Sequence, residues 1–165
     1  MPKVVHKRRR RGTPLQIIYG PEESIGYQLR KTSRKMAGLL KVQLENESIT
    51  IAMWYFLRAL WERDGVIQRT LADKVGLMQP TTVTTLHNLQ NRGLVRTERD
   101  KTDRRSIRIY LTAKSQRLKT RLLPKVATIN KAVSRGVNKK EFQLCLRILK
   151  TIHENADATL SKIRD

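Results

Sequence analysis

The spacing of apolar residues predicts α-helices over most of the chain. Apolar side chains recur three or four positions apart in residues 25–47 and 49–65, as they do on the buried face of a helix. The same spacing returns after residue 112 and again after Gly136. Residues 94–112 differ, because apolar and polar side chains alternate there in two runs around a charged loop, which is typical of β-strands. We therefore expect a mainly α-helical fold with a small β-hairpin.

Residues 69–93, RTLADKVGLMQPTTVTTLHNLQNRG, predict two short helices joined by a turn. Thr70 is placed to cap the first helix, and Gly76 is placed to end it. Pro80 suits the first turn of the second helix, where its missing N–H would have had no intrahelical acceptor, and Gly93 stops that helix. Two helices joined by a short turn that contains glycine are typical of a helix-turn-helix.

The last third of the chain predicts two long amphipathic helices. Thr112 is placed to cap the first, which we expect Pro124 to kink or interrupt. The second carries a nearly heptad apolar stripe that requires a partner helix. Its residues are Phe142, Cys145, Leu149, Ile152, Ala156, Leu160 and Ile163. On this stripe the single cysteine is expected to be a buried thiol.

The charge of the chain is strongly unbalanced. Its 165 residues include 35 Lys and Arg but 14 Asp and Glu, a formal net charge of +21. The excess is not confined to the N-terminal KRRRR run, since residues 21–165 alone carry +15. Such an imbalance opposes compaction unless a polyanion is near, so double-stranded DNA or another nucleic acid is the expected partner.

Several other classes of protein fit the sequence poorly. No apolar stretch approaches the roughly 20 residues that span a bilayer, and no signal-peptide core follows the first basic residues, so we expect no membrane partner and a cytoplasmic location. The three histidines are isolated, and no glycine-rich phosphate loop or zinc-spaced Cys/His set is present. We therefore expect no enzyme activity, no cofactor and no metal site.

The second short helix has an uncharged face. With Val83, Leu86 and Leu89 or Gln90 turned inward, the opposite face contains short side chains that form hydrogen bonds. Such a face suits the DNA major groove, since Thr offers a hydroxyl and a methyl and Asn pairs with adenine. The alternative is an ordinary β-branched helix surface. The candidate readers are Gln79, Thr81, Thr84, Thr85 and Asn88.

The hairpin is expected to carry a second contact. Its tip contains Asp103, Arg104 and Arg105. An arginine at such a tip can enter a minor groove, and Asp103 would then form an ion pair that orients an arginine. The alternative is a solvated charged loop. Behind the tip, Ile107, Ile109 and Leu111 alternate with Arg108 and Tyr110, so one face is expected to pack on the helices.

The run LADKVGLMQPTTVTTLHNLQNRGLVRTERDKTDRRSIRIYLTAKSQRL resembles the winged helix-turn-helix core of MarR-type transcriptional regulators. Its most distinctive element is Asp103 and Arg105 before a strand that ends in Leu111 and Thr112. The resemblance implies that Arg105 is a minor-groove arginine organised by Asp103, and that the face from Thr81 to Asn88 reads the major groove. Many members have arginine where this chain has Thr84, so guanine recognition at that position is not implied.

The resemblance also implies an organisation and a mode of action. Residues 1–23 would form a basic flexible arm, 24–48 and 113–165 the helices of a homodimer, and 49–112 the DNA-binding lobe. We expect a sequence-specific DNA-binding regulator, a repressor that is released by a small effector, aromatic or other. Tyr27, Trp54 and Arg58 are the candidate pocket, although Trp54 also suits the core. The alternative function is sequence-independent binding of nucleic acid through charge alone.

Overall fold

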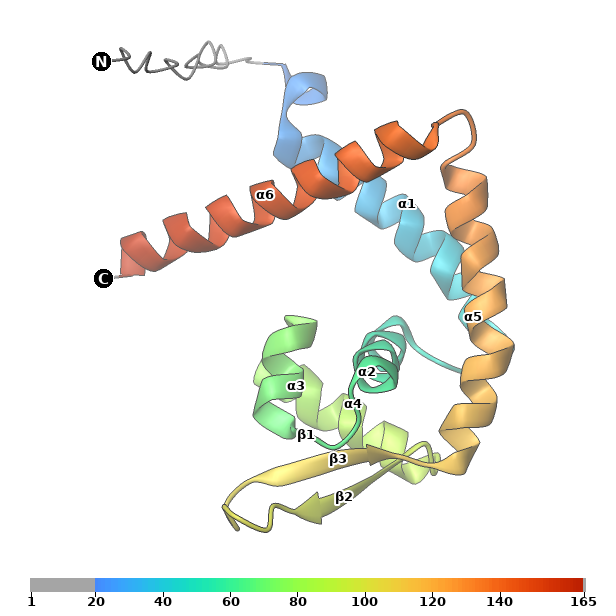
Figure 1. Cartoon of the computed structure of the whole chain (residues 1–165), viewed down its shortest axis with the longest axis vertical. Coiled ribbons are helices and arrows are strands. Elements are labelled where there is room, and N and C mark those ends of the chain that lie inside the picture. Colours follow the sequence, from blue (N-terminus) through green and yellow to red (C-terminus); the bar gives the residue numbers. More distant parts are fainter. Residues whose placement is uncertain (1–19, 165) are drawn as a thin grey trace, which may run out of the picture. The chain divides into compact units, whose positions relative to one another are not determined.

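The computed structural model of the chain describes residues 20–164 (Figure 1). Most of the expected basic arm, residues 1–19, lies outside the described residues, and Pro21–Glu23 forms a short 3-10 helix, η1. The chain divides into two compact units, residues 1–37 and 38–165. Helix α1, Ile25–Glu45, begins in the first unit and ends in the second.

The second unit contains the remaining helices and a small antiparallel sheet. The elements are α2 (Ile51–Glu62), β1 (Val66–Ile67), α3 (Gln68–Val75), α4 (Gln79–Asn91), β2 (Val95–Arg99), β3 (Ile107–Leu111), α5 (Ala113–Val133) and α6 (Lys139–Arg164). The strand order is β1-β3-β2, and Val95 faces Leu111 in the hairpin. The expected mainly helical fold with a β-hairpin wing is confirmed. Strand β1 was not predicted, because two residues are too few to show an alternating pattern.

The core of the second unit forms around α2. Met53, Trp54, Phe56, Leu57 and Leu60 are all buried, so this helix is covered on nearly every side. Helices α3 and α4 pack against α2 and against the sheet (Figure 1). Leu71 of α3 and Leu86 and Leu89 of α4 are buried in this core. The wing therefore emerges from the same rigid core that holds the two short helices.

The ends of the helices test the predicted caps. Gly76 adopts a left-handed φ of +69° at the end of α3, and the Thr112 hydroxyl accepts a hydrogen bond from the Ser115 N–H at the start of α5, as expected. The prediction for Thr70 is wrong, since α3 already begins at Gln68, directly after β1. Pro124 does not interrupt α5, which continues from Ala113 to Val133.

The apolar stripe of α6 is exposed in the single chain. Phe142, Leu149, Leu160 and Ile163 all lie open to solvent. Cys145 is exposed as well, so the expectation of a buried thiol is not met within one chain. Within residues 20–164, none of the helices is both long and apolar enough to cross a membrane.

Candidate nucleic-acid interface

The orientation of α4 decides which of its side chains are accessible. Thr82, Thr85, Leu86 and Leu89 are buried against the core, and Thr85 is only 5% exposed. Thr85, predicted on the reading face, is therefore excluded from direct contact with DNA. Val83, predicted on the inner face, is 56% exposed. The prediction of the inner face of α4 failed because it placed threonines outside, whereas Thr82 and Thr85 are buried. Burial of the Thr82 hydroxyl is compensated by the hydrogen bond that it donates to the Leu77 carbonyl at 3.5 Å.

The outer face of α4 carries no Lys, Arg, Asp or Glu. Gln79, Thr81, Thr84 and Asn88 are exposed, as predicted. The Thr84 hydroxyl donates to the Pro80 carbonyl at 3.1 Å, so its oxygen and methyl group stay available to a ligand while its proton is occupied. Two exposed residues that the sequence interpretation left out of this face, Val83 and His87, belong to it.

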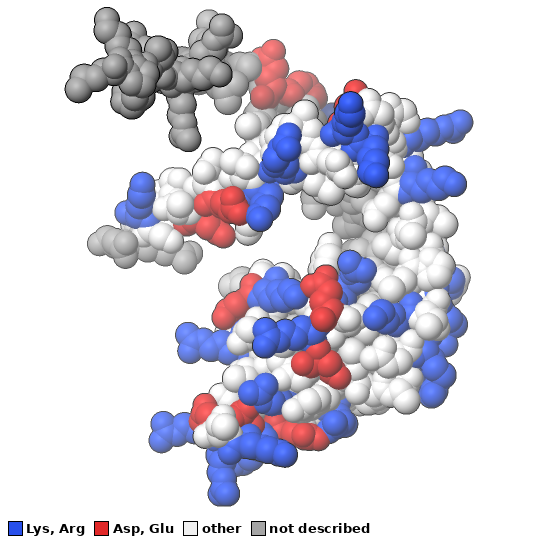
Figure 2. Space-filling model, in the orientation of Figure 1, with Lys and Arg blue, Asp and Glu red and all other residues white. Residues whose placement is uncertain are grey.

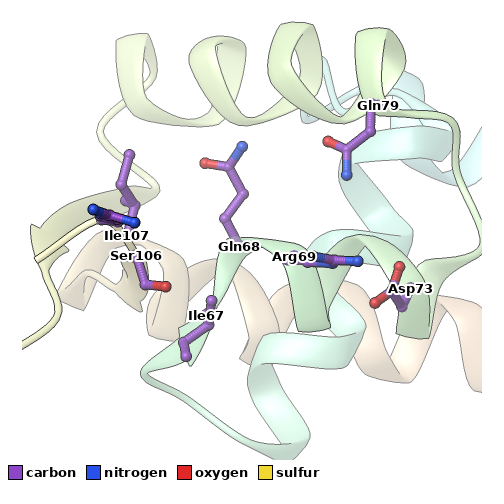
Figure 3. Close-up of a pocket in the computed structure, with 8 residues that line it drawn as sticks. Ile67, Gln68, Arg69, Asp73, Gln79, Ser106 and Ile107 are labelled. Atoms are coloured by element: carbon purple, nitrogen blue, oxygen red, sulfur yellow. The ribbon is translucent and has the colours of Figure 1, made fainter. Parts of the chain in front are cut away.

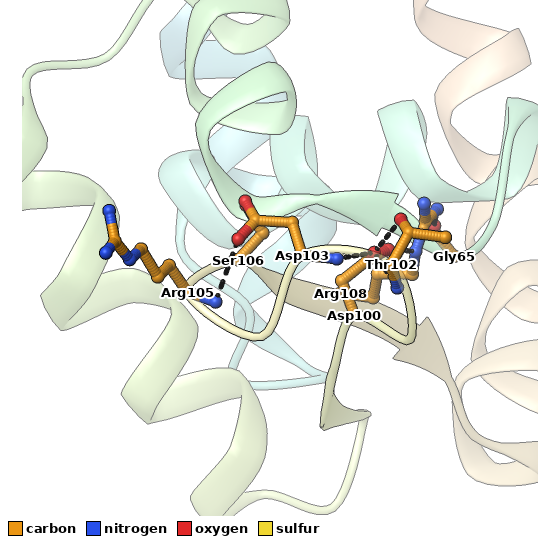
Figure 4. A network of polar contacts seen from close by, with 7 residues as sticks. All are labelled: Gly65, Asp100, Thr102, Asp103, Arg105, Ser106 and Arg108. Atoms are coloured by element: carbon orange, nitrogen blue, oxygen red, sulfur yellow. Dashed lines mark hydrogen bonds and ion pairs between the residues drawn. The ribbon is translucent and has the colours of Figure 1, made fainter.

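Asp100 anchors the base of the wing loop, and the sequence pattern gave no sign of this role. The Asp100 side chain is 3% exposed, and its Oδ1 accepts hydrogen bonds from the Thr102 hydroxyl at 2.5 Å, the Thr102 N–H at 2.8 Å and the Asp103 N–H at 2.9 Å. Its Oδ2 forms an ion pair with Arg108, whose Nη1 donates to the Gly65 carbonyl at 2.7 Å (Figure 4).

The same contacts keep Asp100 ionised. Hydrogen bonds from the Thr102 hydroxyl, then from the Asp103 and Thr102 N–H groups and Arg108, hold the pKa of Asp100 far below its ordinary value of 3.8. Each of these donors favours the charged carboxylate. Through Arg108 the wing is thus tied to Gly65 in the loop before β1, 43 residues earlier in the chain.

Asp103 organises the tip of the wing through the backbone. Its Oδ1 accepts from the Arg105 N–H at 3.0 Å, and its Oδ2 accepts from the Ser106 hydroxyl at 2.7 Å. The expected ion pair with an arginine is not formed, since none of the ion pairs among residues 20–164 includes Asp103. Figure 4 shows the Arg105 side chain pointing away from this carboxylate. Arg104 and Arg105 are both exposed.

A groove of about 480 Å³ lies between the wing and the two short helices. It brings together two predicted residues from different elements, Gln79 of α4 and Arg105 of the wing. Figure 3 shows Gln68 of α3 pointing toward α4, and Gln79 pointing back toward α3. Gln68 and Arg69 were missed, because α3 was expected to start three residues later, after a cap at Thr70. The other lining residues are Ile67, Asp73, Ser106 and Ile107.

The second unit carries an excess of positive charge, and Arg69 and Arg105 line the groove itself. Residues 38–165 contain 25 Lys and Arg against 12 Asp and Glu. Figure 2 shows Lys and Arg side chains at the tip of the wing and along α5. An uncharged helix face flanked by cations is an arrangement in which phosphate contacts supply affinity and base contacts supply specificity.

Comparisons with known proteins agree with this geometry. The model of the MarR family matches residues 49–107, which run from the start of α2 into the hairpin. The transcriptional regulator PA3341 is 32% identical, and its crystal structure aligns over 82% of this chain and 99% of that one with a TM-score of 0.75. The chain belongs to the MarR family. It is accordingly a transcriptional regulator and not an enzyme.

Two further structures extend the comparison. A MarR-family regulator from Silicibacter pomeroyi is 27% identical over 82% of this chain and 92% of that one, with a TM-score of 0.74. The transcriptional repressor CouR, solved with a 23-mer DNA duplex, is 26% identical over 80% of this chain and 94% of that one, also with a TM-score of 0.74. The similarity thus extends well beyond the matched segment.

The candidate effector residues of this MarR-family chain are less accessible than the interface. Trp54 is 4% exposed and packs edge to face against Trp61, with ring centroids 5.7 Å apart, so it does not line an open pocket in the single chain. The Arg58 guanidinium lies 5.8 Å from the Trp54 ring and is exposed. Tyr27 belongs to the first unit, where Lys31 lies over its ring at 5.4 Å.

A cavity of about 580 Å³ occurs elsewhere in the second unit, at the turn between α1 and α2. Lys41 and Glu45 line it from α1, and residues 48–52 line it from the turn and the start of α2. None of the three candidate effector residues is part of this lining. It was not foreseen from the sequence, because its walls come from the turn and from two helices whose packing only the fold determines.

Proposed function

We propose that this MarR-family chain is a sequence-specific DNA-binding regulator that acts as a homodimer on a pseudo-palindromic site. The observation that carries the proposal is the groove in which Gln79 of α4 and Arg105 of the wing meet. A DNA strand that passes between a helix in the major groove and a wing in the minor groove must run through such a space. A transcriptional regulator must share a compartment with the DNA that it binds, and we therefore propose a cytoplasmic location.

Each part of the interface has a proposed role. Gln79, Thr81, Thr84 and Asn88 read base edges in the major groove, where short polar side chains distinguish the four base pairs. Arg105 enters the adjacent minor groove, and Asp103 holds the backbone that presents it. Arg104 and the newly found Arg69 add phosphate contacts. Thr85 no longer belongs to this set, because it is buried.

The homodimer is supported by the exposed apolar stripe of α6. Phe142, Leu149 and Leu160 leave too much apolar surface in water for a stable single chain, and a second copy offers the matching surface. Two-fold symmetry would present one recognition helix to each half-site. The half-site centres are then expected about 10 bp apart, or a small multiple of that distance.

The proposed repressor function includes release by a small effector that binds at Arg58; of the other two candidates, Trp54 is buried and Tyr27 belongs to the other unit. The exposed Arg58 guanidinium suits a carboxylate on an aromatic ligand. An effector lowers DNA affinity only by as much as it prefers the dimer geometry that misplaces the recognition helices.

One contact would couple such a change to α4. The Arg92 guanidinium at the end of α4 donates to the Glu47 carbonyl at 2.9 Å, and the Glu47 carboxylate binds Arg121 of α5, also at 2.9 Å. Movement of the α1–α2 turn, where Glu47 lies, would therefore reach α4 and α5 together.

The test of the DNA-binding proposal is selection from random duplex DNA at about 0.15 M salt, where binding by charge alone is partly screened. We expect enrichment of a two-fold symmetric motif. Recovery of unenriched sequence would instead support the alternative, a sequence-independent binder driven by the net charge of +21.

The contribution of the wing is tested with two neighbouring arginines. Arg105→Ala is expected to weaken binding and to relax the preference for A/T-rich flanks, since Arg105 lines the groove. Arg104→Ala removes the same charge from a residue outside that lining, and is expected to lower affinity equally for all sequences. An unchanged flank preference in Arg105→Ala would remove the wing from the mechanism.

A further inference from the structure

His87 lies on the exposed face of α4, one helical turn before Asn91. The Asn91 amide nitrogen, Nδ2, lies 3.2 Å from Nδ1 of the His87 ring. Among the hydrogen bonds of the residues that the structure describes, His87 makes no other. The ring is therefore held by its own helix on one side, while its second nitrogen is left for a ligand.

The contact with Asn91 determines which nitrogen of the ring carries the proton. With its nitrogen turned toward the ring, the Asn91 amide can only donate, and in this orientation Nδ1 of His87 accepts. In a neutral imidazole one nitrogen accepts and the other donates. The proton of the neutral ring consequently stays on Nε2, on the side of the ring that faces away from Asn91. His87 thus offers a hydrogen-bond donor and no acceptor.

We propose that His87 is a specificity-determining residue, which reads guanine in the major groove, and that Asn91 is its positioning residue. A lone donor fits guanine best, because guanine presents two adjacent acceptors, N7 and O6, whereas in adenine the N7 acceptor adjoins the N6 donor. This inference rests on the proposed function, since it requires α4 to enter the major groove. In this chain His87 would supply the guanine recognition that is not implied at Thr84, where many family members have arginine.

The neighbouring turn of the helix extends the assignment. Val83 precedes His87 by four residues and is 56% exposed, so its methyl groups lie on the same face. A valine methyl group contacts the C5-methyl of thymine favourably. One helical turn rises about 5.4 Å and one base pair about 3.4 Å, so the thymine is expected one or two base pairs from the guanine.

The experiment is selection from random duplex DNA with the full chain and three variants, His87→Ala, His87→Asn and Asn91→Ala. Both positions are exposed, and circular dichroism melting curves would check that the variants fold alike. The wild type is expected to enrich a symmetric motif with guanine at one position of each half-site. In His87→Ala, discrimination at that position is expected to fall roughly three- to tenfold, the value of one hydrogen bond, with the rest of the motif intact.

The other two variants make the assignment specific. His87→Asn is expected to change the preference from guanine to adenine, since asparagine pairs with N6 and N7 of adenine. Asn91→Ala is expected to weaken the guanine preference by less than His87→Ala does, at the same position. An intact motif in His87→Ala, or a uniform loss at every position, would overturn the inference while leaving the proposed function standing. A wild type that enriches no motif would overturn the proposed function itself.

Discussion

Gly65 occupies a position where any side chain should disturb the wing. Its φ is +67°, and a Cβ atom built there would lie 2.7 Å from Cε1 of Tyr110 on β3. The Gly65 carbonyl accepts the hydrogen bond from Arg108 that continues the network from Asp100. The Arg96 guanidinium stacks 4.6 Å from the centroid of the Tyr110 ring, so a displaced ring would also lose this contact. Gly65→Ala therefore strains both the turn and the anchor of the wing.

Gly76 provides a matched control for the size of this effect. Its φ is +69°, almost the same, but a Cβ atom there meets nothing within 4 Å. In both variants the left-handed conformation costs about 1–2 kcal/mol, partly offset by about 0.4–1 kcal/mol from the stiffer unfolded chain. Only Gly65→Ala adds the contact with Tyr110, an overpacking of about 1–3 kcal/mol. The difference between the two variants isolates that contact.

The assay is urea unfolding of the wild type, Gly65→Ala and Gly76→Ala at one protein concentration, because the stability of a dimer depends on concentration. We expect Gly65→Ala to lose about 1–3 kcal/mol more unfolding free energy than Gly76→Ala, and to bind its selected DNA site more weakly. Equal losses in the two variants would refute the reasoning, since they would mean that Tyr110 and the wing move aside without cost.

Three further predictions concern the wing, the recognition helix and the dimer. Because the pKa of Asp100 is lowered in the folded protein, the ionised carboxylate stabilises the fold fully above its ordinary pKa of 3.8, and this stabilisation is lost as the pH falls toward the folded pKa. The difference in unfolding free energy between wild type and Asp100→Asn should therefore shrink below about pH 4. A constant difference would contradict this. Thr85→Ser removes a buried methyl group and should cost about 1 kcal/mol in urea unfolding, whereas Thr84→Ser should leave stability unchanged but alter the selected DNA motif; the reverse pattern would mean that the face of α4 is assigned wrongly. Leu149→Asp should dissociate the dimer in analytical ultracentrifugation, while Thr151→Asp on the opposite side of α6 should not; dimers in both would exclude this stripe as the interface.

Local signals in the sequence identified the elements of the DNA-binding lobe. Gly76 and Thr112 mark a helix end and a helix start through contacts within a few residues, so their effect does not depend on the rest of the fold. The alternation that predicted the hairpin is equally local, and the paired strands β2 and β3 follow it. The wing residues Asp103 and Arg105 were predicted from the charged tip of the hairpin and then from the family resemblance, and the structure adds how the first holds the backbone of the second.

The sequence by itself therefore determined the order and type of the main helices and of the hairpin, but not strand β1, together with the excess of positive charge and the family. The tertiary structure alone decided which face of α4 is buried, because the usual preference of valine for burial and of threonine for exposure is reversed at Val83 and Thr85. It alone joined Asp100, Arg108 and Gly65, and placed Arg69 beside the groove. Contacts between distant segments depend on how helices and strands pack, and local spacing carries no record of that packing.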